Sequence, residues 1–308
     1  MNKPRFMIRF FLLTAALPVL VSLAACGTLA SMASAGAQVA GALGVIDQNT
    51  ADAVSKSSDA IGRAVEEISP EQEYYIGRAV AANILSRYKI WNGSPALTAY
   101  LNRICAAITI NSPKPEIYNG YHVAILDSTE INAFATSGGH IFVTRGLIAC
   151  TASEDSLASV IAHEIAHIQL QHSTRAIRTS RITQAVLVTG GSAADLAASG
   201  TSLSELTDIF NESVGQIVET MINNGYSQTQ EFAADNLALS LLASAGYEPS
   251  SLITMLRALE KNQSGQRGGF SKTHPTPARR ISNAELSAGR YSVADTQSYR
   301  QARYTRTR

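Results

Sequence analysis

Three residues in this chain, His163, Glu164 and His167, have the types and spacing of a metal-dependent hydrolytic site. On a helix, residues four apart lie one turn above each other, so both imidazoles can reach the same ion. Glu164 lies about 100° further round, at the margin of that face, where it can accept a proton from water without binding the metal. This H-E-x-x-H arrangement predicts a zinc site that hydrolyses an amide bond.

The sequence around the motif is typical of a buried helix. The run at 156–161 contains neither Gly nor Pro, and Asp155 is a candidate cap for the start of the helix. Apolar residues recur at spacings of four, four and three, as on the buried face of a helix: Leu157, Ile161, Ile165 and Ile168. A chance occurrence of the motif is the alternative, and this helical context counts against it.

A catalytic zinc site with two histidines needs a third protein ligand. His172 follows the motif but points about 140° away from His167, so we interpret it as a C-terminal residue favoured by the helix dipole. Glu231 is the candidate, because Asp235 lies four residues further along the same helix face. One carboxylate can then bind metal while the other accepts the second N–H of a ligand imidazole. Three other acidic residues lack such a partner: Glu205, Glu212 and Glu219.

Two short segments, 121–126 and 140–144, are rich in β-branched and aromatic residues and predict strands. With a Gly-Gly turn before the second segment, they predict a small antiparallel sheet beside the zinc helix. An exposed edge strand there could pair with an extended peptide. The residues of this predicted substrate strand are Asn132, Ala133, Phe134, Gly138 and Gly139. A purely structural hairpin is the alternative, and both can hold.

Four segments, in a fixed order, resemble one family: the zinc metalloendopeptidases that include HtpX and the CAAX prenyl proteases (metallopeptidase family forty-eight). The segments are 132–147, 163–167, 231–235 and 274–281, and the likeness covers about residues 70–285. Because the chain lacks several long apolar spans, it looks like the soluble periplasmic branch, similar to BepA and LoiP.

The resemblance implies an α+β, mainly helical domain of the gluzincin type, with the active-site helix packed beside the small antiparallel sheet. It also implies one Zn²⁺ per chain, with Glu164 as general base and Asp235 supporting a metal ligand. The ligands that it implies are His163, His167 and Glu231.

Two further residues, His274 and Arg280, match positions that lie near the metal in this family. By the resemblance, His274 either donates to the developing oxyanion or caps the zinc in a resting, self-inhibited state. Arg280 either supports that oxyanion or anchors the loop that carries His274.

The first 25 residues are typical of a signal peptide of the lipoprotein type. A positively charged start precedes an apolar segment, 10–23, that is too short and too interrupted by Pro18 to span a membrane. The sequence Leu-Ala-Ala-Cys at 23–26 resembles a bacterial lipobox, which implies cleavage before Cys26 and acylation of its thiol. Gly27 follows Cys26 where an Asp would favour the inner membrane, so the resemblance implies the inner face of the outer membrane. An ordinary signal peptide or a membrane anchor is the alternative.

Charge and cysteine content narrow the possible partners and bonds. Removing residues 1–25, which hold three basic residues and no acidic one, leaves 22 basic and 24 acidic side chains. This net charge of −2 gives no general electrostatic case for binding nucleic acid. If Cys26 is acylated, Cys105 and Cys150 form either one disulfide in an oxidising periplasm or two separate buried thiols. Both possibilities remain open.

The remaining sequence predicts the domain organisation. Residues 26–69 are rich in Ala, Gly and Ser, which suits a lipid-anchored tether with a loose first helix. Residues 70–286 predict a single zinc metallopeptidase domain that begins with helices at about 70–88 and 95–110. Two helices within 176–226 predict either a lid over the cleft or two core helices. Residues 287–308 predict a basic, disordered tail.

These expectations combine into a hypothesis about function. The chain is expected to be a periplasmic zinc metalloendopeptidase, held on the outer membrane by lipidated Cys26. Its expected role is quality control, the degradation of misfolded or stalled envelope proteins, with unfolded or misassembled proteins as substrates and the outer-membrane assembly machinery as a partner. An assembly chaperone with a latent zinc site is the alternative from another class, and a zinc hydrolase of non-peptide bonds is another.

Overall fold

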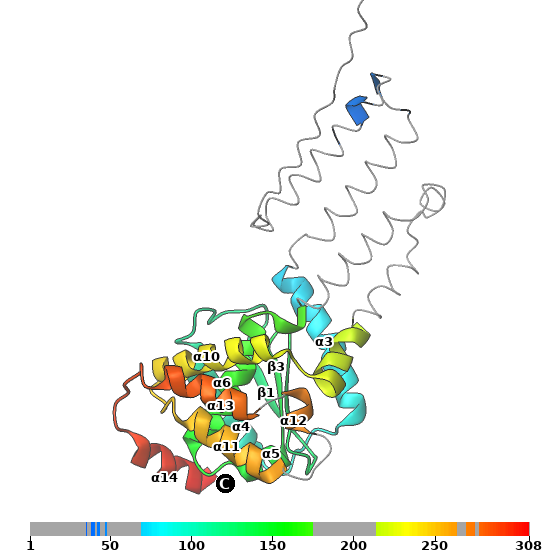
Figure 1. The fold of residues 1–308 in the computed structure, drawn as a ribbon. Helices are drawn as coiled ribbons and strands as arrows, with labels where there is room; N and C mark the ends of the chain where they lie inside the picture. Colours follow the sequence, from blue (N-terminus) through cyan, green and yellow to red (C-terminus); the bar gives the residue numbers. More distant parts are fainter. Residues whose placement is uncertain are drawn as a thin grey trace, which may run out of the picture. The chain divides into compact units, whose positions relative to one another are not determined.

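The computed structural model describes a few residues between 35 and 47 and four longer ranges, 69–174, 214–263, 269–274 and 277–307 (Figure 1). The chain divides into two units, residues 1–66 and 67–308, and the second holds the predicted domain. The predicted signal peptide, Cys26, almost all of the predicted tether and most of the 176–226 region lie outside the described residues. No helix in the described ranges has the length and apolar character needed to cross a membrane.

The first two helices of the domain begin where the sequence predicts. Helix α3, Pro70–Arg87, starts with a capping box in which Ser69 and Gln72 each accept a hydrogen bond from the other's backbone N–H. Helix α4, Pro95–Thr109, has Ser94 as its N-cap and Pro at its first position. These starts were predictable because their signals are local.

A three-stranded sheet follows, made of β1, His122–Leu126, β2, Ala133–Thr136, and β3, His140–Thr144. The strand order is β1-β3-β2; β2 is antiparallel to β3, whereas β1 is parallel to β3. The small sheet was predicted, but its purely antiparallel pairing was wrong. The chain between the two predicted strands forms β2, which folds back on β3, and this reversal leaves β1 and β3 running the same way.

The turn between β2 and β3 explains two of the glycines in the predicted substrate strand. Gly138 and Gly139 have φ values of 80° and 94°, a region that other residues rarely adopt. A Cβ on Gly139 would lie 2.2 Å from the carbonyl oxygen of Gly120. The tight turn and the close packing therefore account for both residues without a substrate.

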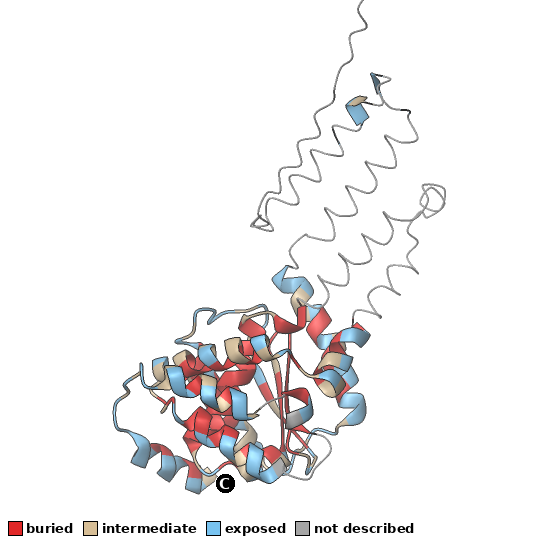
Figure 2. Cartoon of the chain, viewed as in Figure 1, coloured by how far each residue is buried: buried red, intermediate tan, exposed pale blue. Residues whose placement is uncertain are grey.

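Side chains alternate along the strands and form two cores, one on each face of the sheet. The larger core joins the sheet to α4 and to helices later in the chain through Val123, Ile125, Ala133, Ala135, Ile141 and Val143. The smaller core joins it to α3 and to residues 214–226 through Leu126, Phe134 and Phe142. In Figure 1 the sheet accordingly lies between α3 on one face and the helices labelled α6, α10 and α13 on the other. Figure 2 shows that the buried residues are concentrated around the sheet and these helices.

Helix α6, Glu154–Gln169, is the central helix of the larger core, and all of its residues are buried. Around it and the sheet lie α5, Arg145–Cys150; the π-helix η1, Thr220–Asn224; α10, Gln228–Ser244; α11, Ser251–Gln263; α12, Phe270–Thr273; α13, Pro277–Ala288; and α14, Gln297–Thr307. The N-cap of α6 is Ser153, not Asp155 as predicted. Asp155 instead accepts the backbone N–H of Glu248, because it already lies inside the first turn of the helix.

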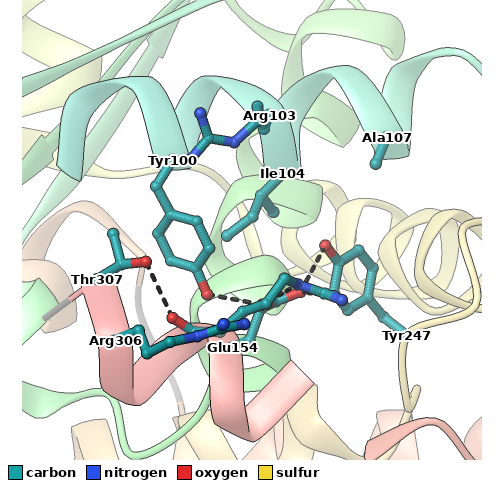
Figure 3. A pocket seen from close by; sticks show the side chains of 9 residues that line it. Tyr100, Arg103, Ile104, Ala107, Glu154, Tyr247, Arg306 and Thr307 are labelled. Carbon is teal, nitrogen blue, oxygen red and sulfur yellow. Dashed lines mark hydrogen bonds and ion pairs between the residues drawn. The ribbon is translucent and has the colours of Figure 1, made fainter. Parts of the chain in front are cut away.

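The predicted disordered tail is wrong over 297–307, where α14 packs against the first turn of α6. Arg300 pairs with Asp155 at 2.9 Å, Arg303 pairs with Glu154 at 2.5 Å, and Tyr304 is buried. The arginines therefore neutralise two buried carboxylates. Figure 3 shows this region: a hollow of about 470 Å³ between α4, the start of α6 and α14, in which the phenols of Tyr100 and Tyr247 point toward Glu154.

The two cysteines of the domain do not form a disulfide. Cys105 is buried on α4, and Cys150 lies half-buried at the end of α5, each as a thiol. Burial raises the pKa of the Cys105 thiol to about 12. The alternative of two separate thiols therefore describes the structure.

Candidate metal centre

Four buried side chains from three segments converge at one point. His163 and His167 lie one turn apart on α6, Glu231 lies in the first turn of α10, and His274 follows α12. One nitrogen or carboxylate oxygen from each lies within 4.8 Å of all the others. Each of the four is at most 2% exposed. The structure thus brings together the three predicted ligands and adds His274 to them.

Four of the six distances between these donor atoms, 3.1 to 3.4 Å, are close to those expected around one zinc ion, and the others are at most 4.8 Å. His163 Nε2 lies 3.1 Å from His167 Nε2 and 3.3 Å from His274 Nδ1. Glu231 Oε1 lies 3.1 Å from His274 Nδ1 and 3.4 Å from His167 Nε2. A tetrahedron with metal–ligand bonds of about 2.0–2.1 Å has edges of about 3.3–3.4 Å. Three imidazoles and one carboxylate are also a ligand set that zinc prefers, so the residues fit the metal.

Local sequence places Glu231 opposite the two histidines. Ser227 caps α10 and forms a capping box with Gln230, which fixes the first turn of the helix just before Glu231. Helices α6 and α10 then pack closely, with fully buried alanines such as Ala166 and Ala234 in the same core. Small side chains allow the two backbones to approach, and this brings the carboxylate to the imidazoles.

Asp235 and Arg280 hold the ligands in place. Asp235 Oδ1 lies 3.0 Å from Nδ1 of His163, the nitrogen opposite the one that faces the other ligands. Arg280, which is fully buried, donates to both oxygens of Asp235 at 2.8 and 2.7 Å. Its Nη1 also pairs with Oε2 of Glu231 at 2.8 Å. The guanidinium is therefore engaged by the two carboxylates of α10, which suits a positioning role.

His172 contacts a metal-site histidine, which sequence reasoning did not predict. Its Nδ1 lies 2.9 Å from Nδ1 of His167, and the side chain is 2% exposed. The predicted direction assumed a continuing helix, but α6 ends at Gln169 and Gln171 adopts a positive φ of 57°. This bend turns His172 back toward the site. No signal in the sequence marks a positive φ at a glutamine.

Tyr226 was also missed. Its ring stacks on the ring of His167, with centroids 4.2 Å apart and an interplanar angle of 28°. The side chain is 6% exposed, directly before the N-cap of α10. In the sequence, its position shortly before Glu231 is the only signal that could have indicated it.

Electrostatics favour a charged Glu231 and a neutral His167, the forms that bind metal. Burial alone would raise the pKa of Glu231, but Arg280 and His274 hold it well below its usual value. Burial lowers the pKa of His167 well below its usual value. Burial also raises the pKa of Glu164, whose Oε1 has no hydrogen-bond partner among the described residues. Glu164 is therefore a basic carboxylate beside the four donors.

Backbone and side-chain bonds fix the segment that carries His274. The N–H of Phe270 donates to the carbonyl of Ile131 at 2.8 Å, and the hydroxyl of Thr273 donates to Oδ1 of Asn132 at 3.1 Å. The ring of Phe270 stacks on His274 with centroids 4.3 Å apart. The segment is thus tied to the chain just before β2, so Asn132 helps to position His274.

Comparison with known proteins also indicates a metallopeptidase. The sequence profile of peptidase family M48 matches residues 95–287. Similar proteins include the mitochondrial metalloendopeptidase OMA1 of Schizosaccharomyces pombe, 26% identical over 72% of this chain and 63% of that protein. The β-barrel assembly-enhancing protease of Escherichia coli is 25% identical over 79% of this chain and 49% of that protein. The metalloprotease LoiP of Escherichia coli is 29% identical over 61% of this chain and 70% of that protein.

The chain thus spans 63% of the length of the OMA1 relative and 49% of the length of the β-barrel assembly-enhancing protease. The profile match covers more than half of the chain and includes the whole of the candidate metal centre, from the histidines of α6 to Arg280. This chain therefore belongs to peptidase family M48.

Proposed function

We propose that this protein is a zinc-dependent metalloendopeptidase. One observation carries the proposal: a buried set of three imidazoles and a carboxylate whose donor atoms lie within 4.8 Å of one another, beside a carboxylate that is not part of the set. His163, His167 and Glu231 would hold the ion. A purely structural zinc site would not need Glu164 beside them.

The residues of this chain divide the work of peptide hydrolysis. Bound zinc would polarise the scissile carbonyl and acidify the attacking water. Glu164 takes a proton from that water and delivers it to the leaving amine, for which its raised pKa suits it. Its Oε1 lies 3.6 Å from Nε2 of His274 and accepts no hydrogen bond from the described residues. Arg280 and Asp235 hold the side chains of Glu231 and His163 in position during the reaction.

His274 caps the metal at rest in this proposal. Its Nδ1 would bind zinc as a fourth ligand beside the other three donors, at the position that a hydrolytic site leaves open for water and substrate. Movement of the segment at 270–274 would open that position. The alternative role for His274, donation to the oxyanion, would apply once the ring has moved away.

The substrates that we propose are misfolded or stalled proteins of the bacterial envelope. The lipobox at Cys26 favours a protein anchored to the inner face of the outer membrane, and a relative carries the name β-barrel assembly-enhancing protease. Strand β2 lies at an edge of the sheet and contacts α6, and residues 132–134 are the proposed strand for an extended substrate. These residues are buried and not exposed as predicted, so the strand would have to be uncovered before a peptide could pair with it.

A second function is an assembly chaperone with a latent zinc site. The position of His274 favours it, because a capped metal cannot act on a peptide. The two functions differ in whether the cap ever opens.

Metal analysis and casein digestion separate these functions. We expect purified mature protein to contain one zinc per chain and to cleave casein. We expect this cleavage to stop when a chelator removes the zinc. Protein with stoichiometric zinc that leaves casein intact, both as wild type and as His274→Ala, would favour the chaperone.

A further inference from the structure

The hydroxyl group of Tyr226 is the most conspicuous unused polar atom at the metal centre. It is buried and has no hydrogen-bond partner among the described residues. A buried hydroxyl without a partner is destabilising, and native structures rarely keep one without a reason. The ring alone would stack equally well on His167 as a phenylalanine. The oxygen therefore needs an explanation that the folded chain does not supply.

The backbone fixes Tyr226 at the site. Its N–H donates to the carbonyl of Thr273 at 3.1 Å, and Ser227 directly after it caps α10. Gly225 adopts a φ of 73°, and a Cβ there would lie 2.5 Å from the carbonyl of Lys272. Only glycine permits this close approach of the two segments. The tyrosine is thus held between α10 and the segment of His274.

The ring of Tyr226 lies beside two of the proposed metal ligands, with its centroid 4.2 Å from that of His167 and 6.0 Å from that of His274. After burial, the charges of Glu164 and Glu231 are the main causes that raise the pKa of Tyr226. The phenol stays protonated at neutral pH even with an ordinary pKa near 10. Tyr226 is therefore a fixed hydrogen-bond donor on a ring that stacks on a proposed metal ligand.

We propose that Tyr226 is a further catalytic residue, whose hydroxyl donates to the carbonyl oxygen of the scissile peptide as negative charge develops there. This role rests on the proposed peptidase function. In the reaction, the oxygen of water forms a bond to the carbonyl carbon, and the C–N bond then breaks. Glu164 carries the proton from water to the amine nitrogen, and Tyr226 keeps its own proton throughout. A donor already in place stabilises the oxyanion without reorganisation.

Tyr226→Phe tests this role because it removes one oxygen and keeps the ring. Loss of one oxyanion donor typically lowers kcat by about 10²–10³-fold. We expect a fall of about 100-fold in kcat, with KM within about twofold and zinc content unchanged. In metal-free protein we expect the Tm of Tyr226→Phe to equal or exceed that of wild type, because no hydrogen bond is lost.

Tyr247→Phe is the matched control. The phenol of Tyr247 is also buried, but it donates to Glu154 at 3.2 Å, away from the four metal-site donors. We expect a lower Tm in metal-free protein and an unchanged kcat. This control distinguishes a structural tyrosine from a catalytic one.

Two results would overturn the role of Tyr226. One is a kcat of Tyr226→Phe equal to that of the wild-type protein, measured when the wild-type protein is active. The other is a Tm loss in metal-free Tyr226→Phe as large as that of Tyr247→Phe, which would indicate a structural hydroxyl. Wild-type protein that holds zinc but cleaves nothing would instead overturn the proposed function, and this role with it.

Discussion

The two ends of α6 both bury acidic side chains, yet they differ in how those side chains are satisfied. At the first turn, Glu154 accepts hydrogen bonds from Tyr100 at 2.7 Å, from Tyr247 at 3.2 Å and from Arg303 at 3.0 and 2.5 Å. At the motif, Glu164 Oε1 has no hydrogen-bond partner among the described residues. A completed network is typical of structure, and an incomplete one at equal burial is typical of a reactive site.

The same contrast holds for the arginines that serve the two ends. Arg303 on α14 is half exposed and pairs with Glu154 from the surface. Arg280 on α13 is fully buried and bridges Asp235 and Glu231. The first pairing secures the docking of α14, whereas the second holds side chains of the candidate metal centre.

Substitution of the two glutamates should separate chemistry from structure. We expect Glu164→Gln to lower kcat by about 10²–10⁴-fold, the usual contribution of a general base, with one zinc per chain retained. We expect Glu154→Gln to keep kcat and to lower the Tm, since its buried carboxylate accepts structural hydrogen bonds from Tyr100, Tyr247 and Arg303. Cleavage rates, zinc content and thermal unfolding of both variants provide the test. Wild-type cleavage by Glu164→Gln would remove it from the mechanism.

Substitution of the two arginines should show a large difference in stability. Arg280→Met leaves two buried carboxylates without their partner, and breaking such a buried pair costs about 3–5 kcal/mol. Arg303→Met removes a half-exposed partner, and a surface ion pair contributes about 1 kcal/mol or less. Urea unfolding of metal-free protein measures both. Equal losses would show that burial does not distinguish the two arginines.

Removal of the cap should increase activity. His274→Ala takes away one of the four donors at the candidate metal centre, and we expect casein cleavage to rise about tenfold, equivalent to about 1.4 kcal/mol in the barrier. Zinc should also dissociate more readily, because one ligand is lost. Initial rates at saturating zinc give the comparison with wild type. A fall in rate would assign His274 to the reaction itself and not to the cap.

A smaller effect concerns Glu73, which accepts hydrogen bonds from Gln171 and Thr174. Burial raises the pKa of this carboxyl above its usual value of 4.5, despite those bonds and nearby Lys114. Stability from this group is therefore full below the ordinary pKa and is lost as pH rises through the raised one. We expect Glu73→Gln to match wild type near pH 4 and to exceed it by a few degrees in Tm above pH 6. A Tm difference that does not change with pH would contradict this.

The elements that sequence predicted well are those with local signals. The helix start at Ser69 and Pro70, the turn before Pro95 and the apolar spacing of α6 predicted three helices, and H-E-x-x-H with Glu231 predicted side chains that the structure brings together. The features that it missed depend on contacts between distant residues. The alanine-rich β2 has little strand propensity of its own, so the reversal that makes β1 and β3 parallel was not visible.

The site shows the same division. His172 contacts His167 because Gln171 adopts a positive φ. Helix α14 docks because its arginines pair with Glu154 and Asp155, which lie about 150 residues earlier in the chain. Neither event leaves a pattern in the sequence. The resemblance to a family, by contrast, placed His274 and Arg280 near the metal because it compares whole sites.

X-ray absorption at the zinc edge of the wild-type protein tests the central claim most directly, since it reports the atoms around the ion. The account predicts three nitrogens and one oxygen at about 2.0–2.1 Å, from His163, His167, His274 and Glu231. It also predicts that His274→Ala loses one imidazole from the spectrum while it gains activity. A shell that contains sulfur, or a spectrum that the substitutions of these residues do not change, would contradict it.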